Sequence, residues 1–193
     1  RHLAEKILTS RSALEGERKL VTVLFADIAD STALAERIGA EAMHTLLNGF
    51  FELALAEVHR YEGTINQFLG DGFMALFGAP LAHEDHARRA VLVALGIQRT
   101  LRGRAADPVS EKAAVAVRIG LNTGQVVVGR IGDNLRMDYT AVGDTTNLAA
   151  RLQQQAEPGS VCLSEHTYDL VRPYVDCRSL GTRTVKGKAE PVA

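Results

Sequence analysis

The spacing of hydrophobic positions divides the chain into segments with the periods of strands and helices. Residues 19–27 are apolar on both faces, which is typical of a central strand in a sheet. Residues 31–61 have helical spacing in two pieces, which Gly39 separates. The stripe that the second piece is expected to bury consists of Leu46, Phe50, Leu53 and Val58.

A first hairpin is predicted in the middle of the chain. Strands at 64–69 and 73–77 flank Gly70-Asp71-Gly72. An Asp-Gly pair between two apolar runs is a strong turn signal. Helical spacing then returns over residues 84–103.

A second hairpin is predicted farther along. Residues 114–121 and 125–131 have the composition of two strands, and Asn122-Thr123-Gly124 lies between them as a turn. The glycine-rich stretch GLNTGQVVVGRIG has neither Walker nor Rossmann spacing, so we assign its glycines to this hairpin.

The C-terminal part completes an alternating pattern. A helix over 144–156 is predicted, with Asp144 as its N-cap and Pro158-Gly159 as its end. A strand at 160–164, a short helix at 165–171 and one or two terminal strands follow. The order β-α-β-β-α-β is that of a ferredoxin-like split sheet, so the expected fold class is α/β (α+β) with C-terminal additions.

The N-terminal residues 1–16 read as a short helix with a thin apolar stripe. We interpret this helix as a linker that arrives from a missing upstream domain. The alternative is that the helix packs against the domain that follows it. Residues 17–193 then form one domain.

Composition and charge narrow the classes of function. Apolar residues make up 46% of the 193 residues and charged residues 23%, as in soluble globular proteins. The 22 basic and 23 acidic residues leave a net charge of −1, so nothing favours a nucleic-acid partner. No apolar stretch has the length of a membrane span. Cys162 and Cys177 lack the spacing of a zinc site, and a reducing, cytoplasmic setting is expected.

Two carboxylates lie where predicted strands end. Asp27 closes the first apolar strand, and Asp71 lies at the tip of the first hairpin. In neighbouring strands the two would repel each other unless a cation joined them, and Mg²⁺ prefers one or two carboxylates with waters and phosphates. The alternative is that Asp71 only serves the turn.

Four segments resemble the catalytic domain of class III nucleotidyl cyclases, in the order and at the spacing of that family. Residues 25–32 (FADIADST) and 69–74 (LGDGFM) are similar to its two metal segments. Residues 143–152 (GDTTNLAARL) resemble its GDxVNxAARL signature, with Thr146 at the usual Val, and 185–188 (VKGK) resembles its closing element.

The resemblance implies an adenylate cyclase that uses two divalent cations, Mg²⁺ or Mn²⁺. It assigns Asp27, Ile28 and Asp71 to the metals. It assigns Asn147 and Arg151, which share one helix face, to orienting the ribose and stabilising the transition state. The resemblance assigns phosphate binding to Arg136 and Lys186, with Lys188 as the alternative to Lys186. Without the resemblance, Asn147 and Arg151 would be interpreted as an ordinary polar helix face.

The base-reading positions depart from the family pattern. Adenylyl cyclases usually have Lys where this chain has Gln67. Where it has Thr140, many members have Asp, and Thr is found in a subgroup that includes bicarbonate-responsive enzymes. The Gln amide can donate and accept with adenine or, flipped, with guanine. We expect ATP to be the substrate, and because the amide can also pair with guanine, we expect some turnover of GTP.

The family pattern also divides the site between two subunits, so a homodimer is expected. One subunit supplies the metal carboxylates and Arg136, and its partner supplies the base-reading pair, the Asn/Arg pair and Lys186. The alternative function is a degenerate cyclase-like module that binds nucleotide or dimerises and regulates an attached domain.

Three further polar residues invite a metal interpretation but are assigned to simpler roles. His83 and His86 stand at the start of a charged helix, with no third ligand in register, and a solvated helix start is expected. Asp30 is expected to be a solvated loop or cap residue before Ser31.

Overall fold

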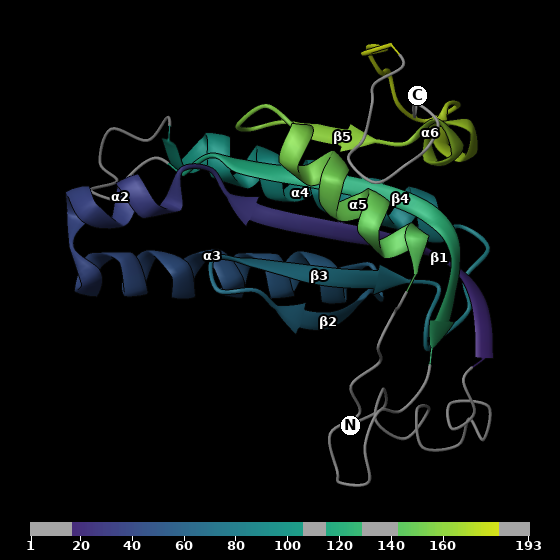
Figure 1. Cartoon of the computed structure of the whole chain (residues 1–193), viewed down its shortest axis with the longest axis horizontal. Helices are drawn as coiled ribbons and strands as arrows, with labels where there is room; N and C mark the ends of the chain where they lie inside the picture. The colour runs from purple at the N-terminus through teal and green to yellow at the C-terminus, as the bar shows by residue number, and fades with distance from the viewer. Residues whose placement is uncertain (1–16, 106–114, 129–142, 182–193) are drawn as a thin grey trace, which may run out of the picture.

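The structure is a computed structural model that describes residues 17–105, 115–128 and 143–181 (Figure 1). Its elements along the chain are β1 Glu17–Ile28, α2 Ser31–Ile38, α3 Ala40–Arg60, β2 Thr64–Phe68, β3 Gly72–Phe77, α4 His86–Ala105, β4 Val117–Val128, α5 Asp144–Gln155, β5 Val161–Leu163 and α6 Glu165–Val171. The predicted linker helix at 1–16 lies outside the described residues. Among the helices that are described, none is long and apolar enough to cross a membrane.

Within the described residues, five strands form one sheet in the order β2-β3-β1-β4-β5. The first four pair antiparallel, and β5 joins β4 in parallel. The first four strands and their two helical connections confirm the predicted βαββαβ arrangement, and β5 and α6 are C-terminal additions to it.

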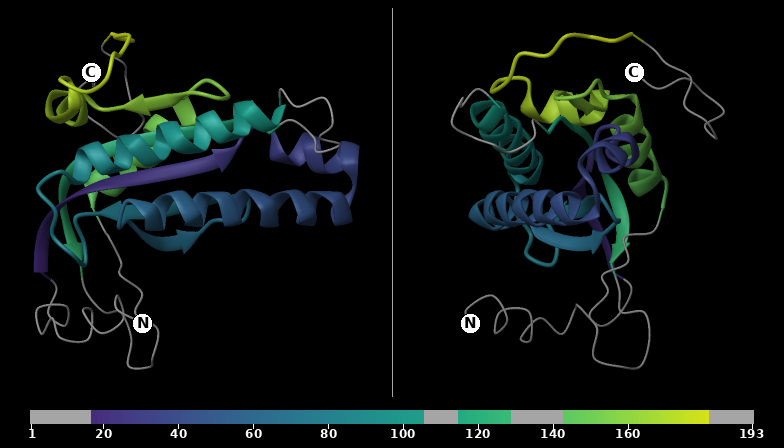
Figure 2. Two further views of the ribbon diagram at one scale, coloured as in Figure 1. Left: turned by 180° about the vertical axis from the view of Figure 1, so that it is seen from behind. Right: turned by 90° about the vertical axis from the view of Figure 1, so that its left-hand side faces the viewer.

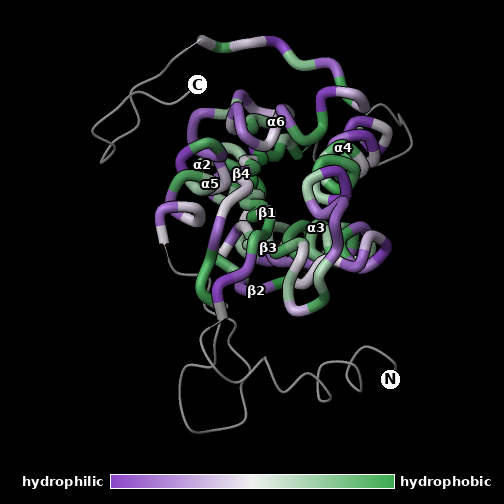
Figure 3. The backbone as a smooth tube through the Cα atoms, turned by 90° about the vertical axis from the view of Figure 1, so that its right-hand side faces the viewer, coloured by the Kyte–Doolittle hydropathy of each residue, from purple (hydrophilic) through white to green (hydrophobic). Residues whose placement is uncertain are grey.

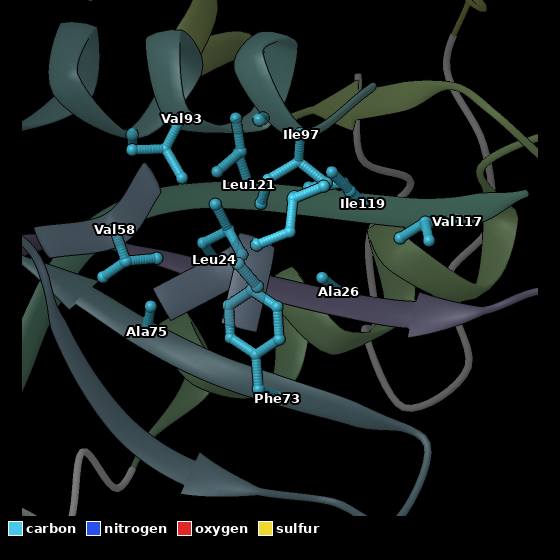
Figure 4. Close-up of a cluster of buried hydrophobic side chains, with 14 of the residues drawn as sticks. Leu24, Ala26, Val58, Phe73, Ala75, Val93, Ile97, Val117, Ile119 and Leu121 are labelled. Atoms are coloured by element: carbon cyan, nitrogen blue, oxygen red, sulfur yellow. The ribbon is translucent and has the colours of Figure 1, made fainter. Parts of the chain in front are cut away.

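Helices cover both faces of this sheet. The right-hand view of Figure 2 shows α3 and α4 on one side and α5 on the other. Side chains from β1, β3, β4, α3 and α4 form the larger core, which includes Leu24, Val58, Phe73, Ile97 and Ile119 (Figure 4). The hydrophobic positions of the central strands lie in the middle of the molecule, as Figure 3 shows.

The predicted helical break and buried stripe are confirmed. Gly39 ends α2 with a φ of 84°, a conformation that glycine adopts readily, and α3 begins at the next residue. Phe50, Leu53 and Val58 are buried in the larger core, and Leu46 packs against it partly buried.

The predicted second hairpin is wrong. β4 runs straight through Asn122-Thr123-Gly124 and pairs with β1 from Val117↔Ile28 to Val128↔Glu17. The long pairing outweighs the local turn signal because every residue of this segment has a backbone partner on β1. The predicted cap of α5 also differs: Gly143 is the N-cap, and Asp144 is the first helical residue.

Candidate active site

The two carboxylates that the sequence places at strand ends are neighbours in the structure. Asp27 lies across from Gly72 of β3, and the Ile28 amide donates to the Asp71 carbonyl at 3.3 Å. A Cβ atom at Gly72 would collide with the Ala26 carbonyl oxygen, so glycine lets the hairpin lie directly against β1. The turn thereby carries Asp71 to the end of the central strand.

The Asp27 carboxyl lies in an unfavourable electrostatic setting. Burial and, next, the negative charge of Asp71 raise the pKa of Asp27 to about 6, while the positive charge of Arg118 acts in the opposite direction. Its Oδ1 atom is buried and has no hydrogen-bond partner within the described part of the chain. The protein groups around Asp27 therefore leave one of its two carboxyl oxygens without a hydrogen bond.

These residues fit a divalent cation. A carboxylate oxygen without a donor, next to a second carboxylate, is the hard oxygen ligand set that Mg²⁺ prefers. Ile28 can offer only its backbone carbonyl, since its side chain has no ligand atom. No group of three or more His, Cys, Asp and Glu side chains that could hold a metal occurs among the described residues, so water and substrate oxygens would complete the coordination.

Two neighbours of Asp27 were not predicted from the sequence. Gln153 of α5 donates from Nε2 to Asp27 Oδ2 at 3.5 Å, across 126 positions of sequence. Arg118 lies opposite Asp27 on β4, and its Nη2 is 3.4 Å from Asp30 Oδ1. No local sequence signal marks either contact, because each depends on the register of β4 and on the packing of α5.

Asn147 and Arg151 lie on the side of α5 that faces away from the sheet. Leu148, Ala149, Leu152 and Gln153 form the buried side of the helix, whereas Asn147 is exposed and Arg151 partly exposed. The two residues share one face, as the i,i+4 spacing predicts.

The structure does not bring Asn147 to the carboxylates of its own chain. Gln153 contacts Asp27, and Asn147 lies six residues earlier on α5. Six residues correspond to about 9 Å along a helix axis. Asn147 also projects from a different side of α5, so Asp27 and Asn147 belong to separate regions of one chain.

Gln67 is exposed on β2, which is the edge strand beyond β3. Its cross-strand partner is Met74, which in turn lies opposite Phe25 of β1. By the alternation of side chains along a strand, Gln67 lies on the same sheet face as Asp27, two strands away, which is roughly 10 Å. The other predicted substrate residues, Arg136, Thr140 and Lys186, lie outside the described residues.

The predicted solvated helix start is wrong for His86. This residue begins α4, is 7% exposed, and its Nδ1 lies 2.8 Å from the Thr22 hydroxyl. His83 lies 3.4 Å from Glu62 Oε2. Asp30 is exposed and is the N-cap residue of α2 by position, although its side chain makes no capping hydrogen bond.

The geometry of the carboxylate pair agrees with a family relationship across almost the whole chain. The sequence model of the family described as the adenylate and guanylate cyclase catalytic domain matches residues 15–193. The chain belongs to this family.

Named relatives include cyclases of both base specificities. The chain is 35% identical over 175 residues to adenylate cyclase 1 of Rhizobium meliloti (strain 1021), covering 89% of this chain and 26% of that protein. It is similar to the crystal structure of the adenylyl cyclase CyaB from P. aeruginosa, with a TM-score of 0.84, 36% identity and coverage of 93% of both chains. It is also similar to the guanylate cyclase domain of RhGC from Catenaria anguillulae in complex with GTP, with a TM-score of 0.82, 30% identity and coverage of 91% and 95%.

These matches support the cyclase fold and the nucleotidyl cyclase family. The chain spans 26% to 36% of the length of the curated relatives that it matches.

Proposed function

We propose that this cyclase domain, residues 17–193, converts ATP into 3′,5′-cyclic AMP and pyrophosphate at sites shared by two copies of the chain. The observation that carries the proposal is the Asp27–Asp71 pair. The raised pKa of Asp27 and its unsatisfied Oδ1 atom, next to the second carboxylate, fit a site for cations and phosphates. Since nucleoside triphosphates are cytoplasmic metabolites, we place the domain in the cytoplasm.

The reaction joins two atoms of one substrate molecule. The ribose 3′-oxygen forms a bond to the α-phosphorus and loses its proton to water, while the bond from that phosphorus to the pyrophosphate oxygen breaks and pyrophosphate leaves. Two divalent cations held by Asp27, Asp71 and the Ile28 carbonyl would stabilise the charges on these oxygens when bound. Such a reaction depends on positioning and charge stabilisation rather than on a covalent enzyme intermediate.

The remaining roles fall to residues that donate hydrogen bonds. Arg151 presents a planar guanidinium that suits phosphate oxygens, and Asn147 can bond a sugar oxygen and orient the ribose. Arg136 and Lys186 are assigned to the triphosphate by their motif positions. These groups would bind and orient the substrate in front of the carboxylates.

Base recognition is assigned to Gln67 and Thr140. Both side chains can donate and accept, so neither leaves a buried group unpaired when guanine replaces adenine. Discrimination should therefore stay below the ~10⁴-fold that an obligate donor or acceptor permits. ATP is the proposed main substrate, with GTP as a slower one.

The distribution of these residues supports a homodimer. The carboxylates lie at the end of β1, whereas Asn147 lies on the outward face of α5, about 9 Å nearer to the start of the helix than Gln153, which contacts Asp27. Two copies related by a two-fold axis could place α5 of one over the carboxylates of the other and form two equivalent sites.

The test is an assay of the purified chain with ATP or GTP and with Mg²⁺ or Mn²⁺. Cyclic AMP should form faster than cyclic GMP, and Asp27→Ala and Asp71→Ala should each abolish both activities. Asp169→Ala, at an exposed position of α6, is the matched control and should retain activity. Failure to form either cyclic nucleotide, or turnover by Asp27→Ala, would refute the proposal. Complete exclusion of GTP would refute only the account of the base pocket.

A further inference from the structure

The strand segment that the sequence presents as a turn is the surface on which α5 rests. A Cβ atom on Gly120 would collide with the α5 backbone at Gln153, and one on Gly124 would lie 2.5 Å from the Thr145 hydroxyl oxygen. Asn122 stands between the two glycines on the same face of β4 and is 5% exposed. The helix therefore packs against two glycines and one buried amide.

Asn122 uses both ends of its amide. Its Nδ2 donates to the Thr145 carbonyl at 3.0 Å, and its Oδ1 accepts from the Ser164 hydroxyl at 2.8 Å. Ser164 is itself held, because its Oγ accepts from the Thr167 amide as the N-cap of α6. The Asn122 side chain is thus fixed in orientation and joins α5 to β4 and to the start of α6.

The first turn of α5 has no side-chain cap of the usual kind. Gly143 occupies the N-cap position, so it provides no side-chain oxygen. The turn is tied to β4 instead, since Thr145 donates from its hydroxyl to the Gln125 carbonyl at 2.8 Å and accepts from Asn122 at its own carbonyl. Asn147 follows Thr145 by two residues in this same turn.

We infer that Asn122 is a positioning residue for the cyclase reaction, because it fixes the first turn of α5 and thereby the location of Asn147. The inference rests on the proposed role of Asn147. Asn122 is buried beneath the helix and acts through it rather than on the substrate. A displacement of about 1 Å in a group that orients a reacting atom can cost up to about 100-fold in rate.

The first experiment measures kcat and KM for ATP in Asn122→Ala. We expect kcat to fall at least about tenfold and KM to change less than about twofold, because the substrate is oriented less well while most of its phosphate contacts remain. In an Asn147→Ala background, the same change should lower kcat by less than about threefold. A residue that works through Asn147 has little left to position once that side chain is gone.

A second variant separates the two hydrogen bonds and covers the case in which Asn122→Ala does not fold. Asn122→Asp keeps an acceptor for Ser164 but loses the donor to the Thr145 carbonyl. It should show the same loss of kcat. Hydrogen exchange at the amides of residues 145–148 should be faster in both variants than in the wild-type chain.

Gln98→Ala is the matched control. Gln98 is a buried amide on α4 that donates to the Val117 and Ser160 carbonyls at 2.7 and 3.0 Å, so its removal costs similar contacts without touching α5. This variant should lose stability but keep kcat within about twofold of wild type.

The outcomes separate this inference from the proposed function. Wild-type kcat in both Asn122 variants, or an equal loss of kcat with and without Asn147, would overturn the positioning role and leave the cyclase proposal intact. Full activity of Asn147→Ala would instead remove the role proposed for Asn147, and the inference would fail with it.

Discussion

The Asp27–Asp71 pair shows how one residue's environment predicts a ligand. Because the pKa of Asp27 in the fold is about 6, above its ordinary 3.8, stability should fall as the pH rises from 3.8 to about 6, and the full cost of ionising this carboxyl remains at higher pH. A bound cation would reverse that cost, since ligands that bind only the native state stabilise it.

Thermal unfolding should reveal this cost and its reversal. At pH 7.5 in a chelator, Asp27→Asn should be more stable than wild type by an amount on the order of 1 kcal/mol, since the carboxyl is partly screened by solvent. Added Mn²⁺ should raise the Tm of the wild type by several degrees and leave that of Asp27→Asn nearly unchanged. Asp169→Asn should respond to Mn²⁺ like the wild type. An equal Mn²⁺ shift in Asp27→Asn would exclude the metal assignment.

The buried His86 side chain should also make the stability of the domain depend on pH. Burial lowers its pKa below 6.5, with His166 and His83 acting in the same direction and Asp85 against them. The unfolded chain therefore binds a proton that the native chain resists, and stability should fall as the pH drops below about 6.5. The slope from one such group is at most about 1.4 kcal/mol per pH unit.

The titration of Asp27 opposes that of His86 in this range, so the comparison is made in an Asp27→Asn parent protein. There His86→Asn, which keeps an acceptor for Thr22, should flatten the pH dependence between pH 7 and pH 5. Urea midpoints measured across that range test it, and His59→Asn in the same parent, at an exposed position, is the control that should keep the slope of the parent. If the slopes of all three proteins coincide, His86 does not titrate as its burial implies.

The close packing of α5 on β4 should determine how much stability is lost when a glycine between them is replaced. Gly120→Ala would force a Cβ atom into the backbone of α5. The strand cannot shift without losing its pairing with β1, and the helix cannot shift without losing its hydrogen bonds to β4. We expect a loss of about 1–3 kcal/mol in the free energy of unfolding. Gly49→Ala, in α3 with open space around its Cβ, should be neutral or stabilising by up to about 1 kcal/mol. Chemical denaturation measures both variants. Equal changes in the free energy of unfolding for Gly120→Ala and Gly49→Ala would contradict the close packing of α5.

The same region shows why part of the fold could be predicted from the sequence and part could not. The Gly70-Asp71-Gly72 turn and the break at Gly39 depend on local backbone preferences, which the sequence displays directly. Asn122-Thr123-Gly124 displays similar preferences but pairs with a strand a hundred residues away, and no local pattern records that register. The meeting of Asp27 and Asp71 was predictable because both mark strand ends, whereas the Gln153 contact depends on helix packing.

At the scale of the whole molecule, the separation of Asp27 from Asn147 predicts complementation. Asp27→Ala and Asn147→Ala should each be nearly inactive alone. With random subunit exchange, half of the dimers are mixed, and in each of these one site carries both lesions and the other carries neither. The mixture should therefore recover roughly a quarter of wild-type activity at equal total protein, by the counting that two-fold symmetry imposes.

The control for complementation is a mixture of Asp27→Ala with Asp71→Ala, whose lesions lie in the same half of the site and should not complement. Subunit exchange is shown separately with two differently tagged copies. Continued inactivity of the first mixture after exchange would mean that the site lies within one chain.

Because Asn147 lies on the outward face of α5, the reaction rate should depend on the concentration of the protein itself. If neither copy holds a complete site, cyclic nucleotide formation in dilute solution should rise with the square of the protein concentration and become first order only once the copies are paired. Any segment or partner that holds two copies together would then raise turnover through effective concentration, without contacting the nucleotide. The spacing between two copies, rather than a change in the carboxylates, would set how fast this domain signals.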